Sequence, residues 1–146
     1  MSKLKRDSLF WTDAGQATIL NFFLGGFGPA QPLLREEQGT SLTIAGLHGT
    51  MMGIAAIVAG FIHPKLNHKY GRRNTSWLGL LIFTLGLPFF ALGPSVQVTL
   101  PAVLFSCVGF NFVILNMVTL LSHHYPETPD LAVSQSNGIN AVGFVF

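Results

Sequence analysis

The chain has 146 residues, of which 49% are hydrophobic and only 10% are charged, and its formal net charge is +2. Soluble domains carry about 25% charged residues, so this composition is typical of a protein whose surface faces lipid. The few clustered cations flank apolar stretches and do not favour nucleic-acid binding, and the single cysteine, Cys107, excludes a disulfide framework.

The N-terminal segment carries Lys3, Lys5 and Arg6, and a long uncharged stretch follows it. Residues 14–34 are long enough to cross about 30 Å of hydrocarbon at 1.5 Å per residue, which predicts a first membrane span. A signal peptide has a similar basic start, but this apolar stretch is too long for one and no convincing small-residue cleavage site follows. We therefore expect an uncleaved first helix.

Three further uncharged stretches predict spans at about residues 42–62, 76–93 and 98–121. A basic loop, residues 63–75, separates the first two of them. The loop holds half of the eight Lys and Arg residues, namely Lys65, Lys69, Arg72 and Arg73. Cations concentrate in the cytoplasmic loops of membrane proteins, so this loop and the N-terminus are predicted to be cytoplasmic.

A fifth uncharged segment begins at residue 131 and reaches Phe146. As a helix it extends only about 24 Å, less than a span needs. We expect a fragment cut inside its fifth membrane helix, and an interfacial or re-entrant C-terminus is the alternative. The predicted fold is an all-α, polytopic transmembrane helix bundle in the cell membrane.

The basic loop resembles the signature Gly-x-Leu-x-Asp-x-x-Gly-Arg-Arg/Lys between helices two and three of the major facilitator superfamily of transporters. The matching residues are Leu66, Gly71, Arg72 and Arg73. Pro64 stands at the first Gly of the pattern and His68 at its Asp. Residues 136–140 also look like the start of a fifth helix in such proteins, and the resemblance covers nearly the whole chain.

The resemblance implies about four and a half helices of the N-terminal six-helix half of a twelve-helix transporter. It also implies a cytoplasmic gate at the motif residues Leu66, His68, Gly71, Arg72 and Arg73. His68 cannot supply the fixed negative charge of the family's Asp. In many proton-linked exporters an Arg precedes a Gly by four residues in helix four. Here Phe105 precedes Gly109, so that signature is missing.

Polar residues inside membrane spans are candidate functional residues, because burying them in lipid is costly. The family's substrate path runs along helices one and four, which makes the substrate-cavity candidates Gln16, Asn21, Asn111 and Asn116. The alternative for each asparagine is an interhelical hydrogen bond worth about 0.6–2 kcal/mol. The proton-coupling candidates are Asp13 and His48. Their alternatives are an interfacial ion pair for Asp13 and a packing hydrogen bond for His48.

The sequence has no nucleophile elbow, phosphate loop or His-Glu-x-x-His motif, so an enzyme is not expected. No Cys or carboxylate stands at zinc spacing from a histidine, and no metal or other cofactor is predicted. The predicted function is secondary active transport of a small solute by alternating access, with the fragment inactive alone. The expected partners are the lipid bilayer, the solute, a coupling ion and the remaining helices of the transporter. A small four-helix oligomeric exporter and a non-transporting membrane assembly subunit are the alternatives.

Overall fold

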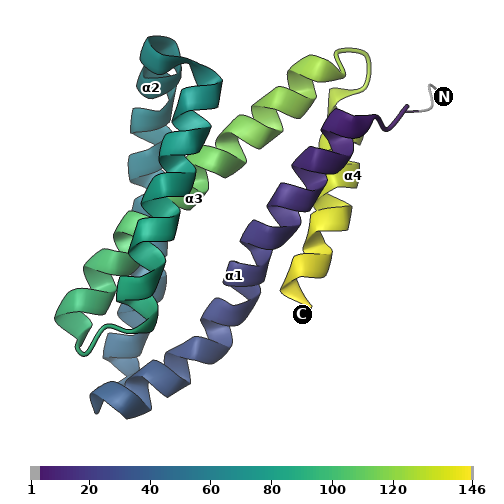
Figure 1. Ribbon diagram of the computed structural model, residues 1–146. Helices are drawn as coiled ribbons and strands as arrows, with labels where there is room; N and C mark the ends of the chain where they lie inside the picture. Colours follow the sequence, from purple (N-terminus) through teal and green to yellow (C-terminus); the bar gives the residue numbers. More distant parts are fainter. Residues whose placement is uncertain (1–3, 146) are drawn as a thin grey trace. The chain divides into compact units, whose positions relative to one another are not determined.

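The computed structural model describes residues 4–145, and every regular element in that range is helical (Figure 1). The elements are α1 (Ser8–Gln38), α2 (Leu42–Ala91), α3 (Val96–His124), α4 (Pro129–Asn140) and the 3-10 helix η1 (Ala141–Phe144). This confirms the predicted all-α fold class. Lys3, one of the cations that orient the N-terminus, lies outside the described residues.

The helix α2 is a run of 50 residues that reverses direction at Gly71 (Figure 1). Gly71 has φ 79° and ψ 158°, a conformation that is essentially restricted to glycine. Residues 63–75, the predicted connecting loop, are helical on both sides of a one-residue break at Gly71. We call the two parts of α2 the first arm and the second arm.

The other predicted spans each lie within a longer helix. Residues 14–34 fall within α1 and residues 98–121 within α3, while the segment from residue 131 forms most of α4 and then η1. Helix bounds describe the backbone and do not mark where a bilayer begins. The limits of the spans therefore stay predictions.

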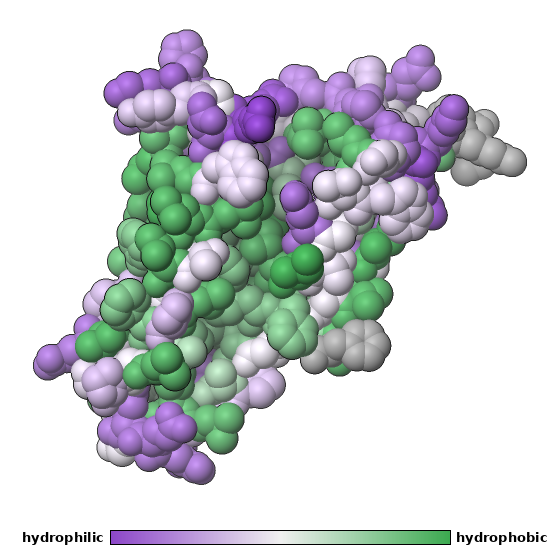
Figure 2. Space-filling model, in the orientation of Figure 1, coloured by the Kyte–Doolittle hydropathy of each residue, from purple (hydrophilic) through white to green (hydrophobic). Residues whose placement is uncertain are grey.

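Two of the described helices, α2 and α3, are long and apolar enough to cross a membrane. Only 22% of the most apolar stretch of α2 is buried, whereas the core helix of a soluble protein would be mostly buried. Large apolar side chains are exposed along α2, such as Phe61, Leu81 and Phe89. Figure 2 shows hydrophobic residues over the middle of the two arms and hydrophilic residues at the turn between them. A lipid environment accounts for this pattern.

The chain forms two compact units, one of which comprises Ala30–Leu115. In this unit the second arm of α2 packs closely on α3 through glycines. A Cβ atom on Gly109 would overlap the carbonyl oxygen of Gly79 and lie 2.6 Å from the amide nitrogen of Phe83. The two helices therefore meet backbone to backbone, as small residues allow in membrane proteins.

The other unit combines the chain up to Pro29 with the chain from Asn116 onward. Here the first part of α1 lies beside α4 and η1 (Figure 1). A Cβ atom on Gly143 would overlap the carbonyl oxygen of Thr18, and one on Gly25 would lie 3.0 Å from the carbonyl oxygen of Phe144. These close backbone contacts set the register between α1 and α4, and hence which of their polar side chains meet.

Candidate functional site

The turn between the arms of α2 presents the motif residues at the surface. Arg72, Arg73 and His68 are exposed, and Leu66 is half-buried. Because Gly71 alone breaks the helix, the two arginines begin the second arm directly after the reversal. The arrangement places two adjacent guanidinium groups at the turn, and guanidinium groups are suited to binding carboxylates or phosphates.

Two side chains that follow Gly71 donate hydrogen bonds to backbone carbonyls at the turn. Thr75 donates its hydroxyl to the Gly71 oxygen at 3.0 Å, and Asn74 donates its amide to the Tyr70 oxygen at 3.0 Å. The Lys69 ammonium lies 5.0 Å from the centre of the Tyr70 ring, a cation–π distance. These contacts stabilise the turn from which the two arginines project.

A second group of polar residues joins α1 to α4. We call Asp13, Asn21, Ser136 and Asn140 the polar seam. The Ser136 hydroxyl donates to Asp13 Oδ2 at 3.3 Å, and Asn21 Nδ2 donates to Asn140 Oδ1 at 2.9 Å and to the Asn140 carbonyl at 3.3 Å. All four residues are buried. Each therefore has a hydrogen-bond partner across the helix pair, as buried polar groups require.

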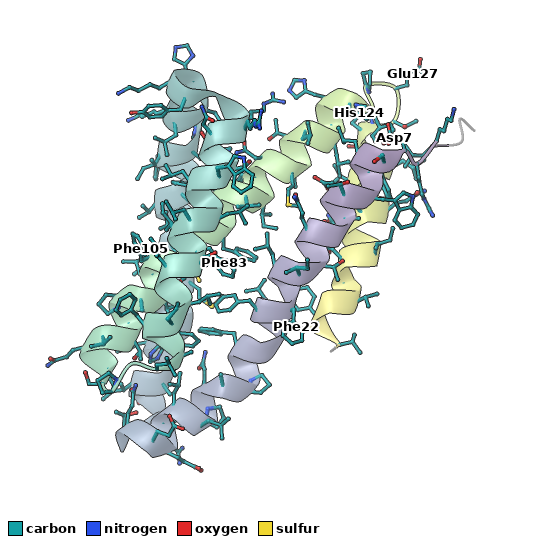
Figure 3. The ribbon with its side chains drawn as sticks, viewed as in Figure 1. Asp7, Phe22, Phe83, Phe105, His124 and Glu127 are labelled. Atoms are coloured by element: carbon teal, nitrogen blue, oxygen red, sulfur yellow. The ribbon has the colours of Figure 1, made fainter. Side chains whose placement is uncertain are left out.

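A third group lies at the N-terminus of α1, where Asp7 contacts the end of α3 (Figure 3). His124 Nε2 donates to Asp7 Oδ2 at 2.6 Å, and the Tyr125 hydroxyl donates to Asp7 Oδ1 at 2.8 Å. The same Oδ1 accepts from the Phe10 amide at 3.0 Å, so Asp7 also caps α1. The hydrogen bonds from His124, Phe10 and Tyr125, in that order, hold the pKa of Asp7 well below its usual range.

This cluster predicts a pH effect on stability. Because the folded-state pKa of Asp7 is lowered, its contribution is complete above the unfolded-state pKa of about 4 and is lost as the pH falls below it. Asp7→Asn keeps a capping side chain but loses the charge, so the unfolding temperature should depend less on pH between about pH 5 and pH 3. Thermal unfolding of the wild type and variant at each pH measures this, with the exposed Asp130→Asn as the matched control. An unchanged pH dependence in Asp7→Asn would contradict the prediction.

The remaining cavity candidates differ in their surroundings. Gln16 is exposed, and Asn111 donates its amide to the Cys107 carbonyl at 2.7 Å within its own helix. Asn21 and Asn116 are buried. The structure thus pairs Asn21 with a residue of α4, while Gln16 and Asn111 take no part in the polar seam.

The proton-coupling candidate His48 is buried between α2 and α3. Its Nδ1 lies 3.1 Å from the Ala45 carbonyl and its Nε2 lies 2.9 Å from the Thr99 hydroxyl. A carbonyl only accepts, so the contact with Ala45 requires a proton on Nδ1, while the Thr99 hydroxyl can donate to Nε2 or accept from it. Both ring nitrogens therefore have hydrogen-bond partners.

Comparison with known proteins identifies the family. A family model described as the Major Facilitator Superfamily matches residues 11–146. The chain belongs to the major facilitator superfamily. It is also similar to the "Uncharacterized transporter YycB" of Bacillus subtilis (strain 168), with 27% identity over 135 residues. That match covers 89% of this chain and 33% of the relative, so the chain spans about a third of the length of the curated relative. No solved structure matches.

Membership of the major facilitator superfamily confirms the resemblance carried by the basic turn. The chain is a membrane protein from a family of transporters, which agrees with the expectation that it is not an enzyme. The family pattern predicts functional residues at the turn in α2. The structure adds candidates elsewhere in this superfamily member. These are Asp7, His124, Tyr125, Ser136 and Asn140. Asp7, directly before an apolar helix, carried the sequence signal of an N-cap, and Ser136 and Asn140 lie in the stretch that resembles the start of a fifth helix.

Proposed function

We propose that this chain forms part of a secondary transporter that moves a small solute across the cell membrane by alternating access. The observation that carries the proposal is the family match over residues 11–146. The similarity to a protein named as a transporter supports it. The chain spans about a third of that relative, and its proposed partners are the remaining helices of a full transporter, the bilayer and the solute.

The charge distribution supports a cytoplasmic location for the N-terminus and for the turn in α2. The exposed cations there include Arg72 and Arg73, while the opposite end of the first arm has one cation near it, Arg35 in the last turn of α1. Positive charge is retained on the cytoplasmic side of the membrane. In this orientation the turn faces the cytoplasm, where the motif arginines act in the gate.

We assign the gating role to Arg72 and Arg73 and the cavity role to Asn21 and Asn116. Both arginines are exposed and are held on one side of a rigid turn, which suits pairing with an opposing group in one conformational state only. Such pairing stabilises that state and so shifts the equilibrium between the inward- and outward-facing forms. The buried amides of Asn21 and Asn116 supply hydrogen bonds suited to an uncharged polar group of a solute.

The gate assignment predicts that Arg72→Gln or Arg73→Gln lowers solute flux by at least about tenfold, the factor for 1.4 kcal/mol, because a hydrogen bond to a charged group contributes about 1.5–3 kcal/mol. The measurement first compares cells that express the complete gene with cells that do not, to find which solutes they take up differently. It then compares the uptake of such a solute by the wild type and the variants. Lys65→Gln is the matched control, since it removes an exposed cation of the first arm outside the motif.

Three results would overturn parts of this proposal. Flux that falls equally in Lys65→Gln and in the two arginine variants would assign the effect to net charge and not to the gate. Solute transport by purified residues 1–146 alone in liposomes would favour the four-helix oligomeric exporter, because a half-site would then be sufficient. If a membrane complex assembles only when the gene is present, and no solute is moved, the result would favour an assembly subunit.

A further inference from the structure

We infer that a groove between α2 and α3 binds one acyl chain of a membrane phospholipid. The groove lies within the unit Ala30–Leu115 and has a volume of about 790 Å³. Its lining comes from Val58 of the first arm, from the second arm between residues 82 and 89, and from α3 between residues 97 and 108. The site is separate from the residues proposed for solute transport, so the inference goes beyond that function.

The groove forms where the second arm and α3 approach each other at a glycine. A Cβ atom on Gly86 would overlap Ser106 Oγ and lie 3.1 Å from the Ser106 amide nitrogen. The large side chains of Leu85, Phe89 and Phe105 also line the groove, and all three are exposed (Phe105 is labelled in Figure 3). The glycine contact therefore forms the floor of the groove, and the large apolar side chains form its walls.

The groove is apolar except at one end. Among the described residues that line it, Gln97 has the one polar side chain, and it is the second residue of α3. Pro101, another lining residue, has no N–H, so the Gln97 carbonyl receives no hydrogen bond from the position that normally donates to it in a helix. This end therefore supplies an amide donor and a carbonyl acceptor, which suit the ester and headgroup of a phospholipid.

The length of the groove matches one leaflet of a bilayer. From Gln97 to Val108 the helix rises about 16 Å, and half of the hydrocarbon thickness is about 15 Å. Gln97 follows the end of the second arm, which lies about 30 Å along that arm from the turn at Gly71. The polar end of the groove therefore lies at the membrane interface opposite the basic turn, and the apolar part extends to the middle of the membrane.

The width of the groove favours a hydrocarbon chain over another helix. A volume of about 790 Å³ over a length of about 16 Å gives a mean cross-section of about 50 Å², whereas a helix about 10 Å wide occupies about 80 Å². A helix could rest only on the rim, while an extended chain can lie inside. Because the surrounding lipid is as apolar as the groove, burial alone gives little preference for it. Close packing and the hydrogen bonds at Gln97 must therefore hold the chain.

The experiment maps where lipid chains contact the protein. The product of the complete gene is reconstituted in nanodiscs that contain phosphatidylcholine with a photoreactive diazirine in the middle of one acyl chain, and mass spectrometry identifies the crosslinked residues. Ile57 is the matched reference, because it is exposed outside the groove and lies as far before Gly71 as Leu85 lies after it. We expect at least about tenfold more label at Leu104 and Phe105 than at Ile57.

Two further results are expected in the wild type. The label in the groove should saturate as the fraction of photoreactive lipid rises, because a single chain fills the site. Phosphatidylglycerol with the same photoreactive chain should give the same pattern, because the groove recognises the chain and not the charge of the headgroup.

Variants test the groove and its polar end separately. Leu104→Trp fills the middle of the groove and should lower the label at Phe105 at least about tenfold, whereas Ile57→Trp adds the same side chain outside the groove and should leave that label unchanged. Gln97→Leu removes the side-chain donor and should lower the label about twofold to tenfold, the range for one hydrogen bond.

Three outcomes would overturn the inference. Equal label at Phe105 and Ile57 that rises in proportion to the photoreactive lipid would show ordinary contact with the bilayer. No label in the groove would show that another helix or a second copy of the chain covers it in the complete protein. Label that persists at Phe105 in a folded Leu104→Trp variant would place the chain elsewhere. If Leu104→Trp does not fold, the wild-type comparison of Phe105 with Ile57 decides, and none of these measurements depends on solute flux.

Discussion

Gly109→Ala should separate α3 from the second arm of α2 and strongly destabilise this unit. The added Cβ atom would overlap the Gly79 carbonyl oxygen and lie 2.6 Å from the Phe83 amide nitrogen. Backbone atoms cannot rotate away as a flexible side chain can, so the helices must move apart. Overpacking a core costs about 1–3 kcal/mol and sometimes more, and we expect the upper end of that range.

The measurement is the unfolding temperature of the purified protein in detergent, followed by the loss of helical signal. Gly53→Ala is the matched control, because nothing lies within 4 Å of the Cβ atom that it adds to α2. There the better helix propensity of alanine should raise stability by up to about 1 kcal/mol. Equal unfolding temperatures for Gly109→Ala and Gly53→Ala would show that the two helices do not touch at Gly109.

Much of the helical fold could be predicted from the sequence, because long uncharged stretches have one stable backbone in lipid. The backbone of residues 63–75 could not be predicted from their charge. Cations indicate contact with water, and contact with water does not require an irregular loop. The backbone reverses at Gly71 alone, and the residues on both sides of it are helical.

The contacts of the candidate site could be predicted only in part. Asn21 was singled out for its position in an apolar helix, and its pairing with Asn140, 119 residues away, depends on the register between α1 and α4. That register is set by the close approach of Gly143 to Thr18, which no local pattern encodes. The interhelical hydrogen bond weighed as an alternative is present at Asn21, and its role toward a solute stays a proposal. The contact between Asp7 and His124 spans 117 residues and was invisible for the same reason.

Gly71→Ala should destabilise the turn of α2 and lower transport together with it. With φ 79° and ψ 158°, Gly71 occupies a region that an L-residue enters at a cost of about 1–3 kcal/mol. Asparagine tolerates the left-handed helical region, but a ψ of 158° lies outside it, so Gly71→Asn should be no better than Gly71→Ala. Unfolding temperatures of the two variants measure the cost, with Gly60→Ala, which meets no atom within 4 Å, as the control in the first arm.

The comparison also separates the two reasons for a glycine at this position. If Gly71 serves only the backbone, flux per folded molecule should stay normal in Gly71→Ala, and the loss should follow the amount of folded protein. If the reversal also places Arg72 and Arg73 in the gate, flux per folded molecule should fall as it does in Arg72→Gln. We expect the second result, because the arginines begin the second arm directly after Gly71 and any change in the turn displaces both. A Gly71→Asn variant as stable as the wild type would show that the turn takes another conformation.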